Sequence, residues 1–149
     1  MEAHKYYVDL NWESQRKGEI SSPELDQKIE VATPPEFPKG MAGIWSPEHL
    51  FTAAVSSCFM TTFLAIAENS KLEFTNLTCP AEGILDKKEG KFAITEIVLK
   101  PVLSIPNEAD REKAEKIMIK AEKACLISNS ITSEVHLETK VLVKDTQPA

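Results

Sequence analysis

Residues 45–67 read WSPEHLFTAAVSSCFMTTFLAIA, and this stretch decides the fold of the chain. Ser46 followed by Pro47 is typical of a helix start, because a serine hydroxyl caps free backbone N–H groups and proline suits the first helical position. After His49 the next 18 residues carry no charge. A helix that is apolar on every side must be buried on every side. We therefore predict a central helix, ending near Asn69, that the rest of the chain surrounds.

The same run has the minimum length for a membrane span. Several serine and threonine residues interrupt it, however, and no basic cluster flanks either end. We therefore interpret it as a core helix. About 150 residues offer few layers with which to cover such a helix. A homodimer that wraps the helix from both sides would solve this problem, and we predict one.

Composition and charge exclude several classes of partner. The chain has 149 residues and a net charge of −6, and no run of lysine or arginine stands out. Nucleic acids and anionic membranes both require a basic footprint, so we expect neither as a partner. The first residues, MEAHKYY, lack the apolar core of a signal peptide. Three cysteines without a CxxC pair fit a reduced, cytoplasmic protein better than a secreted disulfide scaffold.

The remaining segments predict an α+β fold, mostly antiparallel, in the order βββ–α–ββ–α–β, as a single domain over residues 1–149. A polar turn is expected at residues 14–18 and a Pro/Gly-rich loop at residues 33–43, because proline and glycine interrupt regular structure. Alternating or β-branched segments give the strands. These are Lys5–Trp12, two short strands or a hairpin between Gly18 and Ala32, Leu77–Leu85, Lys91–Leu103 and Val135–Val143.

A second helix is predicted after residues 105–108, because apolar residues then recur at spacings of three and four. Cys125 lies at the C-terminal end of this apolar stripe, and Cys58 lies near the middle of the central helix. The two thiols could form a redox pair, in which one attacks and the other resolves the product as a disulfide. They could equally be small core residues, since free cysteine is often buried. Cys79 shows no partner signal and is expected to be structural.

Two charged residues are candidates to act with a reactive thiol. Arg16 lies in a polar loop, as a surface arginine or as the cation that a reactive cysteine needs to lower its pKa. Glu48 stands at the second helical position, where the helix dipole also favours a carboxylate. It precedes Cys58 by ten residues, about 15 Å along a straight helix. If Glu48 and Cys58 serve one site, the carboxylate is more easily supplied by a second subunit.

We predict no metal site and no cofactor. His4, His49 and His136 fall on different elements, and the zinc motif that includes HE requires two histidines at positions i and i+4. Gly-rich phosphate loops, nucleophile elbows and dinucleotide fingerprints are also missing from the sequence.

Two segments carry a resemblance to a known family. SPEHLFTAAVSSCF resembles the [ST]-P-E-x-L-…-A-x-x-x-C-F helix of the OsmC/Ohr family of thiol peroxidases, and REKAEKIMIKAEKACLISNSI is similar to the family's K-A-x-x-x-C-x-[VI]-S-x-[SA] segment. The match extends from the first strand, through a GxL-like segment at residues 83–85, to the last strand. The resemblance implies an intertwined homodimer with two active sites at the subunit interface.

The same resemblance assigns roles to individual residues. Cys58 would be the peroxidatic nucleophile that attacks an organic hydroperoxide, and Cys125 would resolve the sulfenic acid as a Cys58–Cys125 disulfide. Glu48 would pair with an arginine, for which Arg16 is the candidate, and this arginine would hold Cys58 as thiolate. The reductant would be an external dithiol, often a lipoyl group in this family. The alternative is a non-catalytic member that binds a small apolar ligand or senses oxidants.

The sequence also departs from the family pattern in three places. The family arginine usually sits in a G-R-x-G type loop, whereas this chain has Arg16-Lys17-Gly18. The second cysteine is often followed by proline, and here it is followed by Leu126. A bulkier loop, TPPEFPKGMAGIW, replaces the glycine-rich segment that leads into the helix, and this could change access to the pocket.

Overall fold

The computed structural model describes residues 2–144 and separates into two compact units, which divide between Leu50 and Phe51. The predicted α+β class is confirmed, with two long helices and three small sheets.

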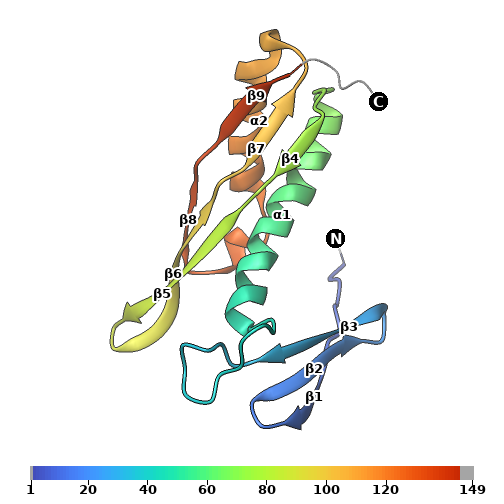
Figure 1. The fold of residues 1–149 in the computed structure, drawn as a ribbon. Helices are drawn as coiled ribbons and strands as arrows, with labels where there is room; N and C mark the ends of the chain where they lie inside the picture. The colour runs from blue at the N-terminus through green and yellow to red at the C-terminus, as the bar shows by residue number, and fades with distance from the viewer. Residues whose placement is uncertain (1, 145–149) are drawn as a thin grey trace. The chain divides into compact units, whose positions relative to one another are not determined.

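The first unit holds an antiparallel meander. It consists of β1 (Asp9–Ser14), β2 (Lys17–Ser22) and β3 (Leu25–Ala32), in the order β1-β2-β3 (Figure 1). The first strand therefore begins and ends later than the predicted Lys5–Trp12. The predicted hairpin is present, with its turn at Pro23. The Pro/Gly-rich segment forms a loop, closed by a hydrogen bond from the Met41 N–H to the Thr33 carbonyl at 2.8 Å.

Helix α1 (Pro47–Asn69) has the predicted bounds and the predicted cap. The Ser46 hydroxyl accepts a hydrogen bond from the His49 N–H at 3.1 Å, which satisfies one of the free donors of the first turn. Along the helix one face is buried, formed by residues at a regular spacing of four. These residues are Val55, Phe59, Phe63 and Ala67.

The expectation that α1 is buried on every side is not met within one chain. Met60 and Leu64, on the other side of the helix, keep 42% and 41% of their surface exposed. The helix is long and apolar enough to cross a membrane, with a mean hydropathy of 1.8 over its most apolar window. A core helix of a soluble protein passes the same test, and one face of α1 does pack into the core.

The second unit contains six strands where the sequence predicted three. The strands are β4 (Asn76–Thr78), β5 (Ala81–Lys88), β6 (Lys91–Leu99), β7 (Val102–Ile105), β8 (Glu134–Leu137) and β9 (Lys140–Val143). They form two sheets of order β4-β7-β9 and β5-β6-β8. Each predicted strand is thus divided in the middle, and its two halves belong to different sheets.

Prolines account for two of these three breaks. Pro80 separates β4 from β5 and Pro101 separates β6 from β7, and proline has no N–H to donate to a sheet ladder. Backbone bonds still cross the break, from the Lys100 N–H to the Pro80 carbonyl at 2.9 Å and from the Lys140 N–H to the Pro101 carbonyl at 3.0 Å. The last chain segment pairs parallel with its neighbours, β8 with β6 and β9 with β7, because it returns after a helical crossover.

Helix α2 (Arg111–Ala124) follows a short 3₁₀ turn at Glu108–Asp110. Both helices of the second unit lie on the same side of its strands (Figure 1). The core forms between them. It consists of the buried face of α1, inward residues of β6 and β7, and the α2 residues Ala114, Ile117, Met118 and Ala121.

One close contact positions α1 on this sheet. Gly83 of β5 lies directly beneath Thr52 of α1, and a methyl group at residue 83 would overlap the Thr52 Oγ1 atom. A larger residue at this position would therefore force the helix or the strand to move.

We predict that Gly83→Ala lowers the free energy of unfolding by about 1–3 kcal/mol, the usual cost of overpacking. In a Thr52→Ala background the same substitution should cost close to nothing, because the opposing hydroxyl is gone. Chemical denaturation of the four proteins measures this coupling. An equal cost of Gly83→Ala in both backgrounds would show that this contact does not fix the helix.

Candidate functional site: a pair of contacting thiols

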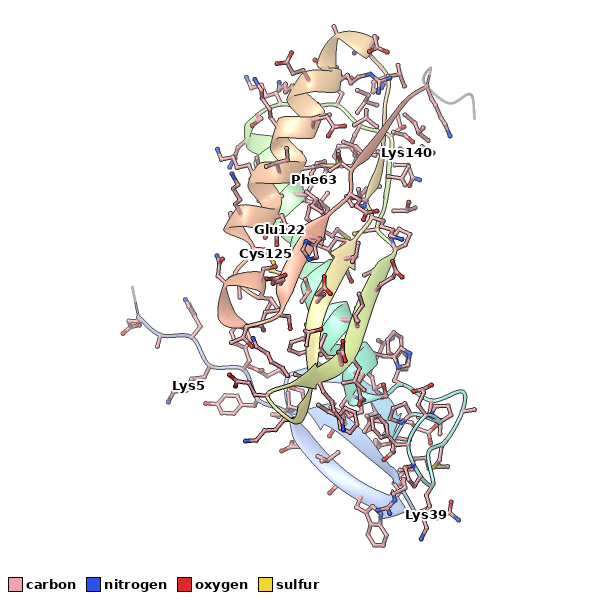
Figure 2. The ribbon with its side chains drawn as sticks, turned by 90° about the vertical axis from the view of Figure 1, so that its left-hand side faces the viewer. Lys5, Lys39, Phe63, Glu122, Cys125 and Lys140 are labelled. Atoms are coloured by element: carbon pink, nitrogen blue, oxygen red, sulfur yellow. The ribbon has the colours of Figure 1, made fainter. Side chains whose placement is uncertain are left out.

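The structure brings Cys58 and Cys125 together within the second unit. Cys58 lies in the middle of α1 and is half-buried, whereas Cys125 is the residue that ends α2 and is fully buried. The Cys125 thiol donates a hydrogen bond to the Cys58 sulfur. Figure 2 shows Cys125 at the C-terminal end of α2, one turn after Glu122. The thiols are both free, so the pair is described in its reduced form.

The backbone that follows Cys125 also turns toward Cys58. Cys125 itself is extended, with φ −64° and ψ 115°, and a 3₁₀ turn begins at Ser128. The Ser130 N–H closes this turn by donating to the Ile127 carbonyl at 2.9 Å, and the Asn129 N–H donates to the Cys125 carbonyl at 3.1 Å. In this conformation the N–H groups of Leu126 and Ile127 lie near enough to the Cys58 sulfur to lower its pKa. Both donors belong to the backbone. Only a substitution by proline, which lacks an N–H group, would therefore remove one of them.

Thr62 supplies a further donor from the helix itself. It lies four residues after Cys58, on the same face of α1, and its Oγ1 is 3.9 Å from the Cys58 sulfur. The neighbouring Thr61 is directed elsewhere, because its hydroxyl donates to the Cys58 carbonyl at 3.1 Å.

These contacts shift the pKa values of the two thiols in opposite directions. Burial alone would raise the pKa of Cys58, but the bonds from Cys125, Ile127, Thr62 and Leu126 together hold this pKa below its ordinary value. Burial raises the pKa of Cys125, and its bond to Cys58 raises it further, although Ser128 acts in the opposite direction. Cys58 is therefore the more acidic thiol of the pair and Cys125 the less acidic one. Only the thiolate is a good nucleophile.

Arg16 and Glu48 belong to the first unit. Arg16 stands in the turn between β1 and β2, where it lines a hollow of about 660 Å³ together with Lys39 and Met41. It also borders a smaller hollow, of about 290 Å³, whose walls include Leu10 and Trp12. Arg16 therefore borders both hollows.

Glu48 lies in the first turn of α1, as predicted. Its neighbour His49 forms a second contact with the cap, since the imidazole Nδ1 lies 2.6 Å from the Ser46 hydroxyl. The His49 ring also packs edge-on against Trp45. Ser46 and His49 are therefore engaged in fixing the start of the helix.

Sequence reasoning missed the donors around Cys58. A signal for Thr62 is present in the sequence, because residues i and i+4 share a helix face. The amides of Leu126 and Ile127 leave no such signal, since their direction depends on the backbone after α2. Cys79 lies at the break between β4 and β5, where burial raises its pKa, in keeping with the structural role expected of it.

The fold and the thiol pair define a class: an α+β protein with a long core helix that carries a cysteine of lowered pKa, and a second thiol close to it. Residues 40–140 match the family model described as OsmC-like protein. The chain therefore belongs to the OsmC/Ohr family, as its sequence motifs indicated.

Known relatives include proteins with and without an assigned function. The uncharacterized protein YmaD of Bacillus subtilis is 30% identical over 97% of both chains. Peroxiredoxin OsmC of Escherichia coli is 30% identical over 62% of this chain and 64% of its own. An organic hydroperoxide resistance protein-like relative from Staphylococcus aureus is 27% identical, over 87% of this chain and 90% of its own. The names of family members thus support a peroxidase-like role at the level of the family.

Solved structures confirm the fold. The OsmC-like protein of unknown function VCA0330 from Vibrio cholerae superposes with a TM-score of 0.82 and is 28% identical. The match covers 92% of this chain and 99% of that one.

The backbone donors at Cys58 can be tested through Leu126. We expect Leu126→Pro to raise the pKa of Cys58, because proline lacks the N–H that donates to the sulfur. The extended conformation of Cys125 suits a residue that precedes proline. Leu126→Ala is the matched control, since it keeps the N–H and removes a side chain that is 66% exposed. The pH dependence of Cys58 alkylation measures the pKa, and identical profiles for the two variants would contradict the assignment.

Proposed function

We propose that this protein is a cysteine-dependent peroxidase that reduces organic hydroperoxides to alcohols. The observation that carries the proposal is the proximity of two thiols whose pKa values are shifted in opposite directions. The pKa of Cys58 is lowered and that of Cys125 is raised. A peroxidase that uses two cysteines needs this difference. The attacking cysteine must be a thiolate, and the resolving cysteine must remain a thiol until the sulfenic acid has formed.

The reaction would proceed in three steps. The Cys58 thiolate attacks the terminal oxygen of the hydroperoxide, so that an S–O bond forms, the O–O bond breaks and the alkoxide takes a proton to leave as an alcohol. The Cys125 sulfur then attacks the Cys58 sulfenic acid, which forms the disulfide and releases water. An external dithiol, such as a lipoyl group, returns both cysteines to thiols by exchange.

The position of Cys125 supports the second step. Its sulfur is already in hydrogen-bond contact with Cys58, so closing the disulfide requires a short approach rather than a rearrangement of helices. Its complete burial also shields the Cys125 thiol itself from external oxidants before this step.

Apolar side chains favour an organic hydroperoxide over hydrogen peroxide. Phe59 follows Cys58 in α1 and stacks on Phe63, with ring centroids 6.3 Å apart. Sites for small apolar molecules are lined mainly by such side chains. The printed names of the relatives from Escherichia coli and Staphylococcus aureus support the same class of substrate.

We further propose that the active form is a homodimer in which Arg16 and Glu48 act on the Cys58 of the other subunit. Two observations on the single chain support this. Apolar residues of β1, Leu10 and Trp12, are exposed, as are Met60 and Leu64 of α1, and a second copy would bury them. The Glu122 Oε1 atom is also buried without a hydrogen-bond partner in residues 2–144, and a cation from a second subunit would satisfy it.

A cytoplasmic location follows from the same chemistry, since the cycle requires a compartment in which dithiols remain reduced.

The peroxidase is tested by measuring turnover of cumene hydroperoxide with a dithiol. We expect Cys58→Ser to lower turnover by at least about 10³-fold, because the covalent nucleophile is lost. Cys125→Ser should permit a single oxidation that stops at the sulfenic acid, detectable by a dimedone adduct on Cys58. Cys79→Ser is the control and should retain full turnover. If both site variants turn over like the parent protein, the chemistry is absent and the ligand-binding alternative is favoured.

Sharing of the site between subunits is tested by mixing two inactive variants. Cys58→Ser and Glu48→Gln proteins, refolded together in equal amounts, should recover about a quarter of the parent activity, since half of the dimers then carry one intact site of two. Refolding each variant alone is the control. No recovery in a mixture that forms dimers would place the carboxylate and the cysteine in the same chain.

A further inference from the structure

Three potential metal ligands lie together on the sheet β5-β6-β8, apart from the cysteines. Glu96 belongs to β6, and Glu134 and His136 belong to β8. Side chains of a strand alternate between its two faces. Ile97 of β6 is fully buried and Val135 of β8 packs against the core, so the three ligands share the opposite face. The His136 and Glu134 side chains are largely exposed.

The distances suit binding to one ion. The His136 Nε2 atom is 3.0 Å from Glu96 Oε1 and 3.7 Å from Glu134 Oε2. All three donor atoms lie within 4.8 Å of one another. Ligands about 2.0–2.2 Å from one zinc ion in tetrahedral geometry are roughly 3.4 Å apart. The two distances from the imidazole lie on either side of this value.

The strand register also creates a need for positive charge. Glu96 and Glu134 are direct partners in the parallel ladder, and like charges at opposed positions destabilise a sheet. Glu82, on the neighbouring strand β5, is compensated by Lys100 at 2.7 Å. Glu96 and Glu134, by contrast, share the single imidazole of His136, which is a cation only when it is protonated. A dication between the three side chains would compensate both carboxylates.

We propose that Glu96, Glu134 and His136 bind a divalent transition-metal ion of the zinc class, with water at the remaining positions. One imidazole nitrogen and two carboxylate oxygens suit zinc, cobalt or nickel, whereas calcium and magnesium prefer oxygen ligands alone. The ion joins β8 to β6. Because β8 follows the segment that starts at Cys125, the ion also fixes the far end of that segment.

No sequence motif indicates this site. Its two ligands on β8 are two residues apart, so they match no helical zinc motif, and the third comes from a strand almost 40 residues earlier. Only the parallel register of β6 and β8 brings the three together.

The test is a calorimetric titration with Zn²⁺ of the full chain in which all three cysteines are serine, so that thiolates cannot bind the metal. We expect one ion per chain, and His136→Ala should weaken its binding by at least about tenfold. Glu134→Gln should also weaken it. His4→Ala and Glu82→Gln are matched controls that remove a histidine and a glutamate outside the cluster, and both should bind as the parent does.

Thermal unfolding provides a second measurement that does not depend on calorimetric signal. Zn²⁺ should raise the Tm of the parent but not that of His136→Ala, while Mg²⁺ should raise neither. Circular dichroism of the variants without metal checks that each remains folded. Equal zinc affinity in His136→Ala and the parent, or the absence of binding at millimolar zinc, would overturn the proposal.

Discussion

The contact between the middle of α1 and the end of α2 is the interaction on which the acidity of Cys58 depends. Burial alone would raise the pKa of Cys58. This thiol is nevertheless the more acidic of the pair, because the end of α2 and the residues after it place hydrogen-bond donors near its sulfur. Three of these donors come from consecutive residues, the Cys125 thiol and the amides of Leu126 and Ile127. A buried sulfur can carry charge only if such donors replace the water that it loses. The packing of α2 against α1 therefore also sets the acidity of Cys58.

The strands serve this contact by fixing where α2 ends. The chain leaves Cys125 through a 3₁₀ turn and re-enters the sheet at β8, so the segment of residues 125–133 is held at both ends. At its start the Asn129 N–H donates to the Cys125 carbonyl, and at its end the Ser133 hydroxyl donates to the Ile94 carbonyl at 2.5 Å. The direction of a backbone N–H group is set by the conformation of the chain. Anchoring this segment therefore fixes the direction of the Leu126 and Ile127 N–H groups at Cys58. A change in the register of β8 would be transmitted to the thiol pair through nine residues.

The sequence predicts elements here better than it predicts their pairing. The bounds of α1 follow from Ser46, Pro47 and the uncharged run, all of which act locally. The division of the predicted strands was missed at Pro80 and Pro101. Each proline interrupts the hydrogen bonds between strands while the chain continues in the same direction, so the strand-like sequence pattern continues across the break. The two cysteines were found through motifs, but the donors around Cys58 depend on the φ and ψ angles of residues 125–127, which carry no side-chain pattern. Glu96 and His136 likewise become neighbours only through the register of two distant strands.

The departure of this chain from proline after the second cysteine has a physical consequence. A proline at residue 126 would leave the Ile127 amide and the Cys125 thiol as donors from this segment, and would remove one N–H from the Cys58 sulfur. Leu126 provides this N–H donor, and its side chain is mostly exposed and needs no packing partner. The lowered pKa of Cys58 thus rests on one more backbone donor than a proline at residue 126 would allow.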